Sequence, residues 1–237
     1  MNLQDQKYSQ FALVREMLRA PEIIGSFDFS QGEKVVASIK QTGRLFATGE
    51  GSSRIFPSKR FIASMLQRGG NACQMATEGG RQSLEYDLAN WTVMGASNSG
   101  QTKELIFLLE KLIAGGHKNL FGLTATPGSK LTQIAESIVL TCGKEEAVAA
   151  TMSVLEQALV YQAVEVGLTG CGCPAQQKEA AKIAADVLAE EYDAELIKKA
   201  AAAPVIYLAG RNNGVAEELA LKTNEITRKR SQYLEGT

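Results

Sequence analysis

Two short loops rich in glycine and hydroxyl side chains are the first candidates for chemistry in this sequence. Each follows a short apolar segment and leads into a helical pattern: Gly49-Glu50-Gly51-Ser52-Ser53 and Ser97-Asn98-Ser99-Gly100-Gln101-Thr102. A helix N-terminus offers unpaired N–H groups and a positive dipole end, which together favour a phosphate. The alternative is that the hydroxyl side chains only cap the helices. Because no P-loop lysine or acidic magnesium motif accompanies the loops, a nucleotide triphosphatase is disfavoured, and we expect a small monophosphate ester held without metal.

The single histidine and the four cysteines restrict the chemistry further. A Ser-His-Asp triad or a multi-histidine metal site would depend on His117 alone, which lies in a predicted solvated turn. Cys171 and Cys173 lack the spacing of a zinc site, whereas Cys73 and Cys142 lie in apolar runs typical of buried positions. We therefore expect neither a metal nor a cofactor.

The elements that must position the two loops follow a regular alternation. Five short apolar runs predict strands, and the segments between them carry helical patterns. The strands are expected at 44–48, 72–76, 91–95, 120–124 and 137–141, with helices at 53–68, 103–114, 127–135 and 150–166. Uninterrupted apolar strands are typical of a parallel sheet that is covered on both faces. The predicted fold class is therefore α/β, a doubly wound five-stranded parallel sheet with helices on both faces.

The segments outside this unit suggest three parts. Residues 1–40 are expected to form an N-terminal helical segment, with one helix to about Ser26 and another at 33–40. Residues 41–170 form the doubly wound domain, which ends at a turn-rich break over 168–174. Residues 175–237 predict one long helix at 176–203, a strand at 204–209 and a helix at 215–230. One strand and one helix cannot enclose a core, so this part resembles the start of a second, incomplete unit.

The charge balance bears on partners and location. The chain carries 25 basic and 26 acidic side chains, a net charge of −1, which gives no reason to expect nucleic acid or membrane binding. It has no apolar run long enough for a membrane span and no signal-peptide core in its first 19 residues. With few cysteines as well, we expect a cytoplasmic protein.

Three motifs in order resemble the sugar isomerase (SIS) domain family, and the resemblance is closest to the isomerase half of glucosamine-6-phosphate synthase and other double-SIS proteins. They are Ala47-Thr-Gly-Glu-Gly-Ser-Ser53, Ser97-Asn-Ser-Gly-Gln-Thr102 and Gly143-Lys-Glu-Glu-Ala-Val-Ala-Ala-Thr151. The second is similar to the family's Ser-x-Ser-Gly-x-Thr phosphate signature. The resemblance implies a flavodoxin-like fold, a truncated second SIS domain and a hexose 6-phosphate as ligand.

The resemblance also implies roles for individual residues. Ser52, Ser53, Ser97, Asn98, Ser99, Gln101 and Thr102 would bind the phosphate, and Val148 and Ala150 would contact the sugar. The segment Ala220-Leu-Lys-Thr-Asn-Glu-Ile226 is similar to the family's catalytic helix. Glu225 would move a proton between C1 and C2 if burial raises its pKa, with Lys222 three residues earlier on the same helix face. The alternative for this pair is an exposed helical salt bridge.

Two functions from different classes follow. The first is a metal-independent phosphosugar isomerase, or a related aminosugar-forming or deglycating enzyme, acting through an enediol or enamine. The second is a non-catalytic, regulatory phosphosugar-binding protein, because the family's ring-opening histidine has no counterpart here. A dinucleotide-binding protein is disfavoured, since neither loop matches that fingerprint. The helix from Val215 is expected to present an apolar face, which predicts a homodimer.

Overall fold

A five-stranded parallel sheet forms the centre of the computed structural model, which describes residues 2–68, 72–170 and 176–236. Its strand order is β2-β1-β3-β4-β5, and every neighbouring pair is parallel. The strands are β1 (Arg44–Gly49), β2 (Gln74–Glu78), β3 (Thr92–Ala96), β4 (Leu120–Thr124) and β5 (Glu136–Val139). The three inner strands are almost entirely buried and the two edge strands are not, as their apolar and mixed sequences require. The predicted α/β fold class is confirmed.

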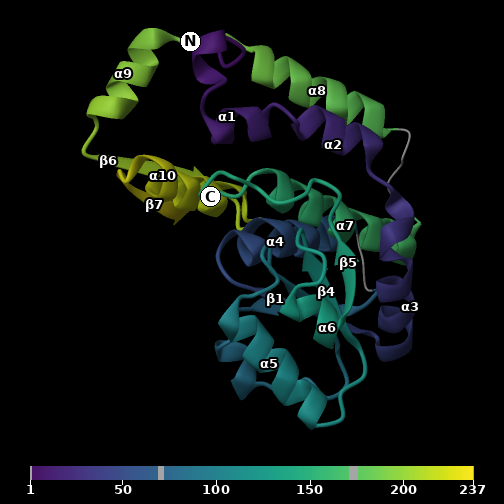
Figure 1. Cartoon of the computed structure of the whole chain (residues 1–237). Coiled ribbons are helices and arrows are strands. Elements are labelled where there is room, and N and C mark those ends of the chain that lie inside the picture. The colour runs from purple at the N-terminus through teal and green to yellow at the C-terminus, as the bar shows by residue number, and fades with distance from the viewer. Residues whose placement is uncertain (1, 69–71, 171–175, 237) are drawn as a thin grey trace.

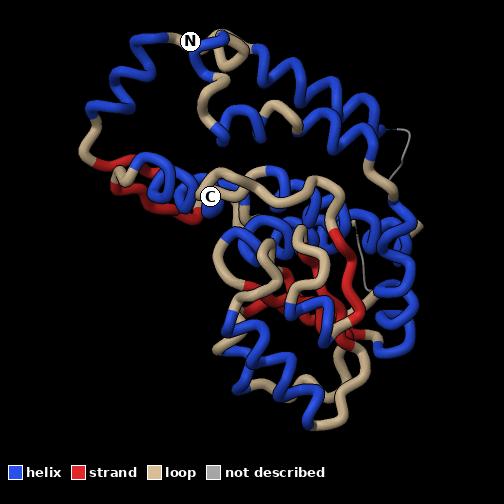
Figure 2. Tube along the Cα trace, viewed as in Figure 1, coloured by secondary structure: helices blue, strands red, loops and turns tan. Residues whose placement is uncertain are grey.

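Helices cover both faces of this sheet (Figures 1 and 2). Leu45 and Ala47 point to a core shared with α3 (Glu33–Thr42), α4 (Ser52–Gln67) and α7 (Met152–Thr169). Phe46 points to the opposite core, which α5 (Lys103–Ala114) and α6 (Lys130–Ile134) complete. The alternation of side chains along β1 thus supplies two cores, as strand geometry dictates.

The N-terminal segment and the helix after the sheet domain pack together. α1 (Ala12–Met17) and α2 (Ala20–Ser26) replace the single helix expected up to Ser26, and α2 lies against α8 (Gln177–Ala189). The prediction of one long helix at 176–203 is wrong, because the chain leaves the helix after Ala189 and α9 (Ala194–Ala202) begins anew. Asp193 explains the restart, since its carboxylate accepts the N–H of Glu195 at 2.8 Å and caps α9.

The C-terminal part contains one strand more than the sequence indicates. β6 (Val205–Gly210), α10 (Val215–Thr227) and β7 (Arg230–Glu235) form a strand-helix-strand unit with a parallel two-stranded sheet. The expectation of a single strand is therefore wrong. α10 packs on α4, and Gly214 allows this approach: a Cβ there would lie 2.5 Å from the Ile55 carbonyl oxygen.

Several expectations concern residues away from the candidate site. His117 is held in the structure, where its Nε2 lies 2.9 Å from the Leu88 carbonyl oxygen and its Nδ1 accepts the Asn119 N–H at 3.2 Å. Cys171 and Cys173 lie outside the described residues. Among the residues that are described, no group of His, Cys, Asp and Glu side chains could hold a metal ion. Across those same ranges, no helix combines the length and apolar character needed to cross a membrane.

Candidate functional site

The two glycine- and hydroxyl-rich loops lie side by side at one edge of the sheet. β1 and β3 are hydrogen-bonded neighbours, and Gly49 at the end of β1 stands opposite Ala96 at the end of β3. The contact is close, because a Cβ on Gly49 would lie 2.7 Å from the Ala96 carbonyl oxygen. The carboxyl edge of a doubly wound sheet is where such folds bind ligands. The topology therefore brings the two predicted phosphate loops together.

The loop 97–102 is organised by its own hydroxyl groups. The Ser97 and Thr102 hydroxyl oxygens lie 2.7 Å apart, and Ser99 Oγ accepts the Gln101 N–H at 3.2 Å. Ser97 is buried, whereas Ser99 and Gln101 are exposed. Gly100 turns the chain with φ +61° and packs directly against Ser129. These contacts within the chain fix the shape of the loop.

Helix capping does not explain these hydroxyl groups. Thr102 is the N-cap residue of α5 and Gly51 that of α4, and neither helix has a side-chain cap hydrogen bond. In α4 the first-turn N–H groups of Ser53 and Arg54 already bond the Glu50 and Gly51 carbonyl oxygens, at 3.2 and 3.0 Å. The first-turn N–H groups of α5 lack an intrahelical acceptor by construction. The arrangement therefore suits an anion at the N-terminus of α5, next to the hydroxyl groups of the first loop.

A cluster of charged side chains on α10 reaches the first loop. Lys222 Nζ donates hydrogen bonds to Ser52 Oγ at 2.7 Å and to Glu225 Oε2 at 2.8 Å. Glu218 lies one turn earlier, with an oxygen 3.4 Å from the same ammonium group. The structure thus brings three predicted site residues, Ser52, Lys222 and Glu225, into one cluster. We call Ser52, Glu218, Lys222 and Glu225 the acid-base cluster.

The two carboxylates of this cluster differ in environment. Glu218 is only 8% exposed, and this burial raises its pKa above the usual value for glutamate. The nearby Glu225 carboxylate acts in the same direction, while the Ser52 hydroxyl and the Lys222 ammonium oppose the shift. The Glu225 side chain is 34% exposed. The burial that the sequence analysis required of Glu225 is therefore found at Glu218.

Sequence reasoning missed Glu218, although a signal for it was present. Glu218 precedes Lys222 by four residues and Glu225 follows it by three, so all three share one face of α10. This spacing alone could have identified Glu218 as a candidate together with Glu225.

The remaining predicted site residues lie in the stretch 143–151 and at the start of α4. Val148 is 97% exposed and Ala150 is partly buried, so the Val148 side chain makes little contact with the rest of the chain. Ser53 follows Ser52 in the first turn of α4, and its N–H bonds the Glu50 carbonyl at 3.2 Å. The Glu50 carboxylate turns to the neighbouring segment, where it accepts the Gly80 N–H at 2.8 Å.

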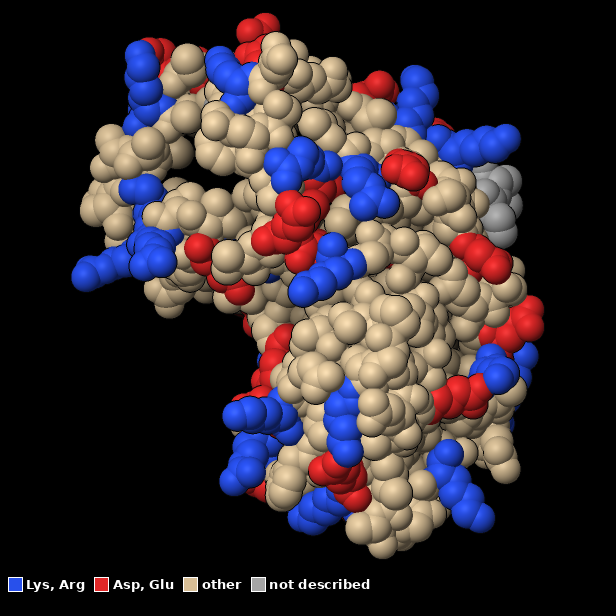
Figure 3. Space-filling view, viewed as in Figure 1, with Lys and Arg blue, Asp and Glu red and all other residues tan. Residues whose placement is uncertain are grey.

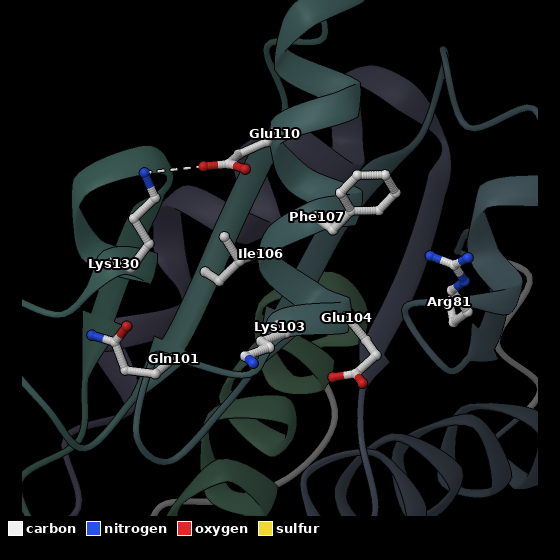
Figure 4. A pocket seen from close by; sticks show the side chains of 8 residues that line it. All are labelled: Arg81, Gln101, Lys103, Glu104, Ile106, Phe107, Glu110 and Lys130. Atoms are coloured by element: carbon white, nitrogen blue, oxygen red, sulfur yellow. Dashed lines mark ion pairs between the residues drawn. The ribbon is translucent and has the colours of Figure 1, made fainter.

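A hollow lies on the outer side of α5 (Figure 4). It measures about 780 Å³ and is lined by Arg81, Gln101, Lys103, Glu104, Ile106, Phe107, Glu110 and Lys130. Lys130 pairs with Glu110 at 3.0 Å, and the Arg81 guanidinium lies 5.8 Å from the centre of the Phe107 ring. Of the predicted site residues, only Gln101 lines this hollow. The hollow is therefore distinct from the acid-base cluster.

Comparisons with known proteins place this geometry in context. No model of a known protein family and no curated protein matches the sequence. Among solved structures, a proposed phosphosugar isomerase from Silicibacter pomeroyi is similar at 19% identity and a TM-score of 0.73, covering 93% of this chain and 70% of the other. The C-terminal domain of glucosamine-fructose-6-phosphate aminotransferase from Francisella tularensis is similar at 16% identity and a TM-score of 0.69. This match covers 95% of this chain and 70% of that one.

A third similar structure is tagatose-6-phosphate ketose/aldose isomerase from Escherichia coli. It is 14% identical with a TM-score of 0.63, and the match covers 95% of this chain and 67% of that one. In each case the match includes nearly all of this chain, so the C-terminal unit belongs to the shared architecture. The chain therefore shares its fold with these three structures.

Proposed function

We propose that the chain binds a hexose 6-phosphate between the two loops at the sheet edge. The phosphate would be held by Ser53, Ser97, Ser99, Gln101 and Thr102 with the first-turn N–H groups of α5. Ser52 would serve both the phosphate and Lys222. Two of the similar structures carry names that include a hexose 6-phosphate, which supports this ligand class.

We further propose that the bound sugar is isomerised. One observation carries this step: the 2.7 Å bond from Lys222 Nζ to Ser52 Oγ joins the acid-base cluster to the phosphate loops. A carboxylate of the cluster would remove the proton from the carbon next to the carbonyl group. The electron pair would form the enediol, and the carbonyl oxygen would take up a proton. Return of a proton to the former carbonyl carbon, with loss of the proton from the other hydroxyl group as its oxygen becomes the new carbonyl oxygen, would complete the exchange between aldose and ketose.

Either Glu225 or Glu218 could be the base in this scheme. The sequence resemblance favours Glu225, and the raised pKa favours Glu218 because a general base acts best with a pKa near the working pH. Lys222, between the two, would stabilise the negative charge that develops on the enediol oxygen. An aminosugar-forming or deglycating reaction would use the same cluster through an enamine.

Proton exchange with solvent tests this proposal. Fructose 6-phosphate incubated with the protein in deuterated water should gain deuterium at C1 or C2, as followed by NMR. The variant that removes the base, either E225Q or E218Q, should slow the deuterium gain at least a hundredfold, the usual contribution of general base catalysis. E217Q is the matched control, since Glu217 lies on the same helix but pairs with Lys59. Binding without any deuterium gain would favour the non-catalytic, regulatory binder.

The proposal also covers how the chain divides into segments and how two copies of it associate. We propose a helical segment over 1–40, a phosphosugar-binding domain over 41–170 and an incomplete second unit over 175–237. Leu219 and Ile226 on α10 are large apolar side chains that remain exposed. A second copy of the chain that covers this helix would make a homodimer.

A further inference from the structure

One buried carboxylate joins the phosphate loop to the stretch 143–151. Glu145 is buried, and its Oε1 accepts the N–H groups of Thr151 at 2.5 Å and Met152 at 2.6 Å. The Thr151 hydroxyl donates to the same oxygen at 3.2 Å. Its Oε2 accepts Asn98 Nδ2 at 2.9 Å and also the Ser153 hydroxyl. A single side chain therefore contacts two separate parts of the candidate site.

On one side Glu145 replaces a helix cap. Thr151 is the N-cap residue of α7, yet its own side chain makes no cap hydrogen bond. The Glu145 carboxylate takes the two N–H groups that would otherwise be unpaired at the start of this helix. The position of α7 relative to the 143–151 stretch is thereby fixed.

On the other side Glu145 fixes Asn98. The Asn98 side-chain amide donates to Glu145. The Asn98 backbone carbonyl oxygen accepts three donors from the end of β4 and the two residues after it: Thr124 Oγ1 at 3.0 Å, the Ala125 N–H at 3.1 Å and Thr126 Oγ1 at 3.1 Å. Asn98 is thus held at both its side chain and its backbone. The orientation of the next peptide, which leads to Ser99, follows from this arrangement.

We propose that Glu145 is a positioning residue: it sets the conformation of the loop 97–102 through Asn98 and so controls affinity for the sugar phosphate without touching it. The proposal rests on the proposed function for its ligand, and it changes the assignment of Asn98. Instead of binding the phosphate with its side chain, Asn98 links the loop to Glu145. The loop can then present Ser99 and the α5 N-terminus to the ligand in one fixed geometry.

A glutamate is suited to this position because every neighbour is a donor. Its two oxygens receive five hydrogen bonds, three at Oε1 and two at Oε2, and a carboxylate brings no donor that would oppose them. A glutamine would present an NH₂ group to Asn98 Nδ2 or to the N–H groups of α7. One of the two connections would then be lost or would require the Asn98 amide to rotate.

The chain offers a matched control for this proposal. Glu156 is also buried and accepts the N–H groups of Thr141 and Cys142, each at 2.7 Å, and the Thr141 hydroxyl at 2.8 Å. Each glutamate thus serves two backbone N–H groups and one threonine hydroxyl. None of the contacts found for Glu156 involves the loop 97–102. E145A and E156A should therefore lose similar stability but differ at that loop.

Amide hydrogen exchange, measured on the complete chain, provides the first readout. We expect E145A to speed exchange in residues 97–102 about tenfold relative to α5, the effect of losing one hydrogen bond to a charged group. E156A should leave this ratio unchanged. If either alanine variant fails to fold, E145Q and E156Q replace the pair, with the same direction expected. Equal exchange in the loop for the two variants would overturn the proposal.

Calorimetric titration with fructose 6-phosphate provides the second readout. E145A should bind about tenfold more weakly than the wild type, whereas E156A should stay within twofold. In an N98A background the further substitution E145A should have no effect on affinity, because the connection is already absent. Independent, additive losses would overturn the route through Asn98. A wild-type chain that binds no sugar phosphate would overturn the proposed function instead, and the exchange comparison would still decide whether Glu145 positions the loop.

Discussion

Replacing Gly100 by alanine should damage the phosphate loop more than the same change at another left-handed glycine. Gly100 has φ +61°, and an added Cβ would lie 2.0 Å from Ser129 Oγ and 2.5 Å from Ser129 Cβ. The left-handed conformation costs about 1–2 kcal/mol for a residue with a Cβ. Overpacking against the buried Ser129 adds about 1–3 kcal/mol, so G100A should lose about 2–5 kcal/mol of unfolding free energy.

Gly128 is the matched control for this prediction. It has φ +71°, and nothing lies within 4 Å of an added Cβ, so G128A should show only the conformational cost of about 1–2 kcal/mol. Urea unfolding of both variants, followed by far-UV circular dichroism, gives the two free energies. The difference between them isolates the contact with Ser129.

A second substitution, at Ser129, should rescue G100A. Because both closest atoms belong to Ser129, S129G should recover most of the excess loss in G100A, although Thr124 Oγ1 at 3.0 Å remains close. If G100A proves no less stable than G128A, or if S129G rescues nothing, then Ser129 does not support this loop as described. The loop would then lack the fixed shape on which the proposed phosphate site depends.

Three further predictions concern other buried charges and the exposed face of α10. Burial raises the folded-state pKa of Glu218 above 4.5, so the proton it binds stabilises the folded chain at low pH and this stability is lost as pH rises through the raised pKa. As the pH rises from 4 to 8, the unfolding free energy of E218Q in urea should therefore increase relative to that of the wild type. A difference between the two that stays constant with pH would contradict this. Glu16 Oε1 accepts the N–H groups of two residues in the 143–151 stretch at 2.5 and 3.2 Å. E16A should therefore lose about 1–3 kcal/mol of unfolding free energy, whereas E22A, at an exposed position, should lose under about 0.5 kcal/mol. Equal losses would be evidence against a stabilising role of the Glu16 contacts. Light scattering should show a dimer that the double substitution of Leu219 and Ile226 by serine converts to monomer, and a wild-type monomer at high concentration would refute the interface.

The sheet and the two loops could be predicted from sequence because their signals are local. Uninterrupted apolar strands and glycine-hydroxyl turns recur in the expected order, and the strands at 44–48 and 120–124 agree with β1 and β4 to within one residue. β7 escaped prediction because its sequence, Arg-Ser-Gln-Tyr-Leu-Glu, is mostly polar. Its place depends on tertiary contacts, since Asn224 on α10 bonds both the N–H and the carbonyl of Ser231.

The candidate site shows the same division between local and long-range information. The loop residues are close in sequence, and their type and spacing nominated them. The bond from Lys222 to Ser52 joins residues 170 positions apart, and the burial of Glu218 depends on how α10 packs against α4. Glu145 was part of a recognised motif, but its contact with Asn98 arises only when β3 and the start of α7 meet. Burial and long-range contacts of this kind are set by packing.

The face drawn in Figure 3 has no extended patch of one charge. Acidic and basic side chains are interspersed on the face drawn in Figure 3, in keeping with the net charge of −1. A site for a small anion requires only local positive potential, which the α4 and α5 N-termini and Lys222 would supply.

The most direct test of the central proposal compares fructose 6-phosphate with free fructose by calorimetric titration. The wild type should bind the phosphorylated sugar and not the free sugar, and the double variant S99A/T102A should lose this binding at least tenfold while keeping its fold. Equal affinity for the two sugars, or full affinity in the double variant, would contradict a phosphate site at the loop 97–102.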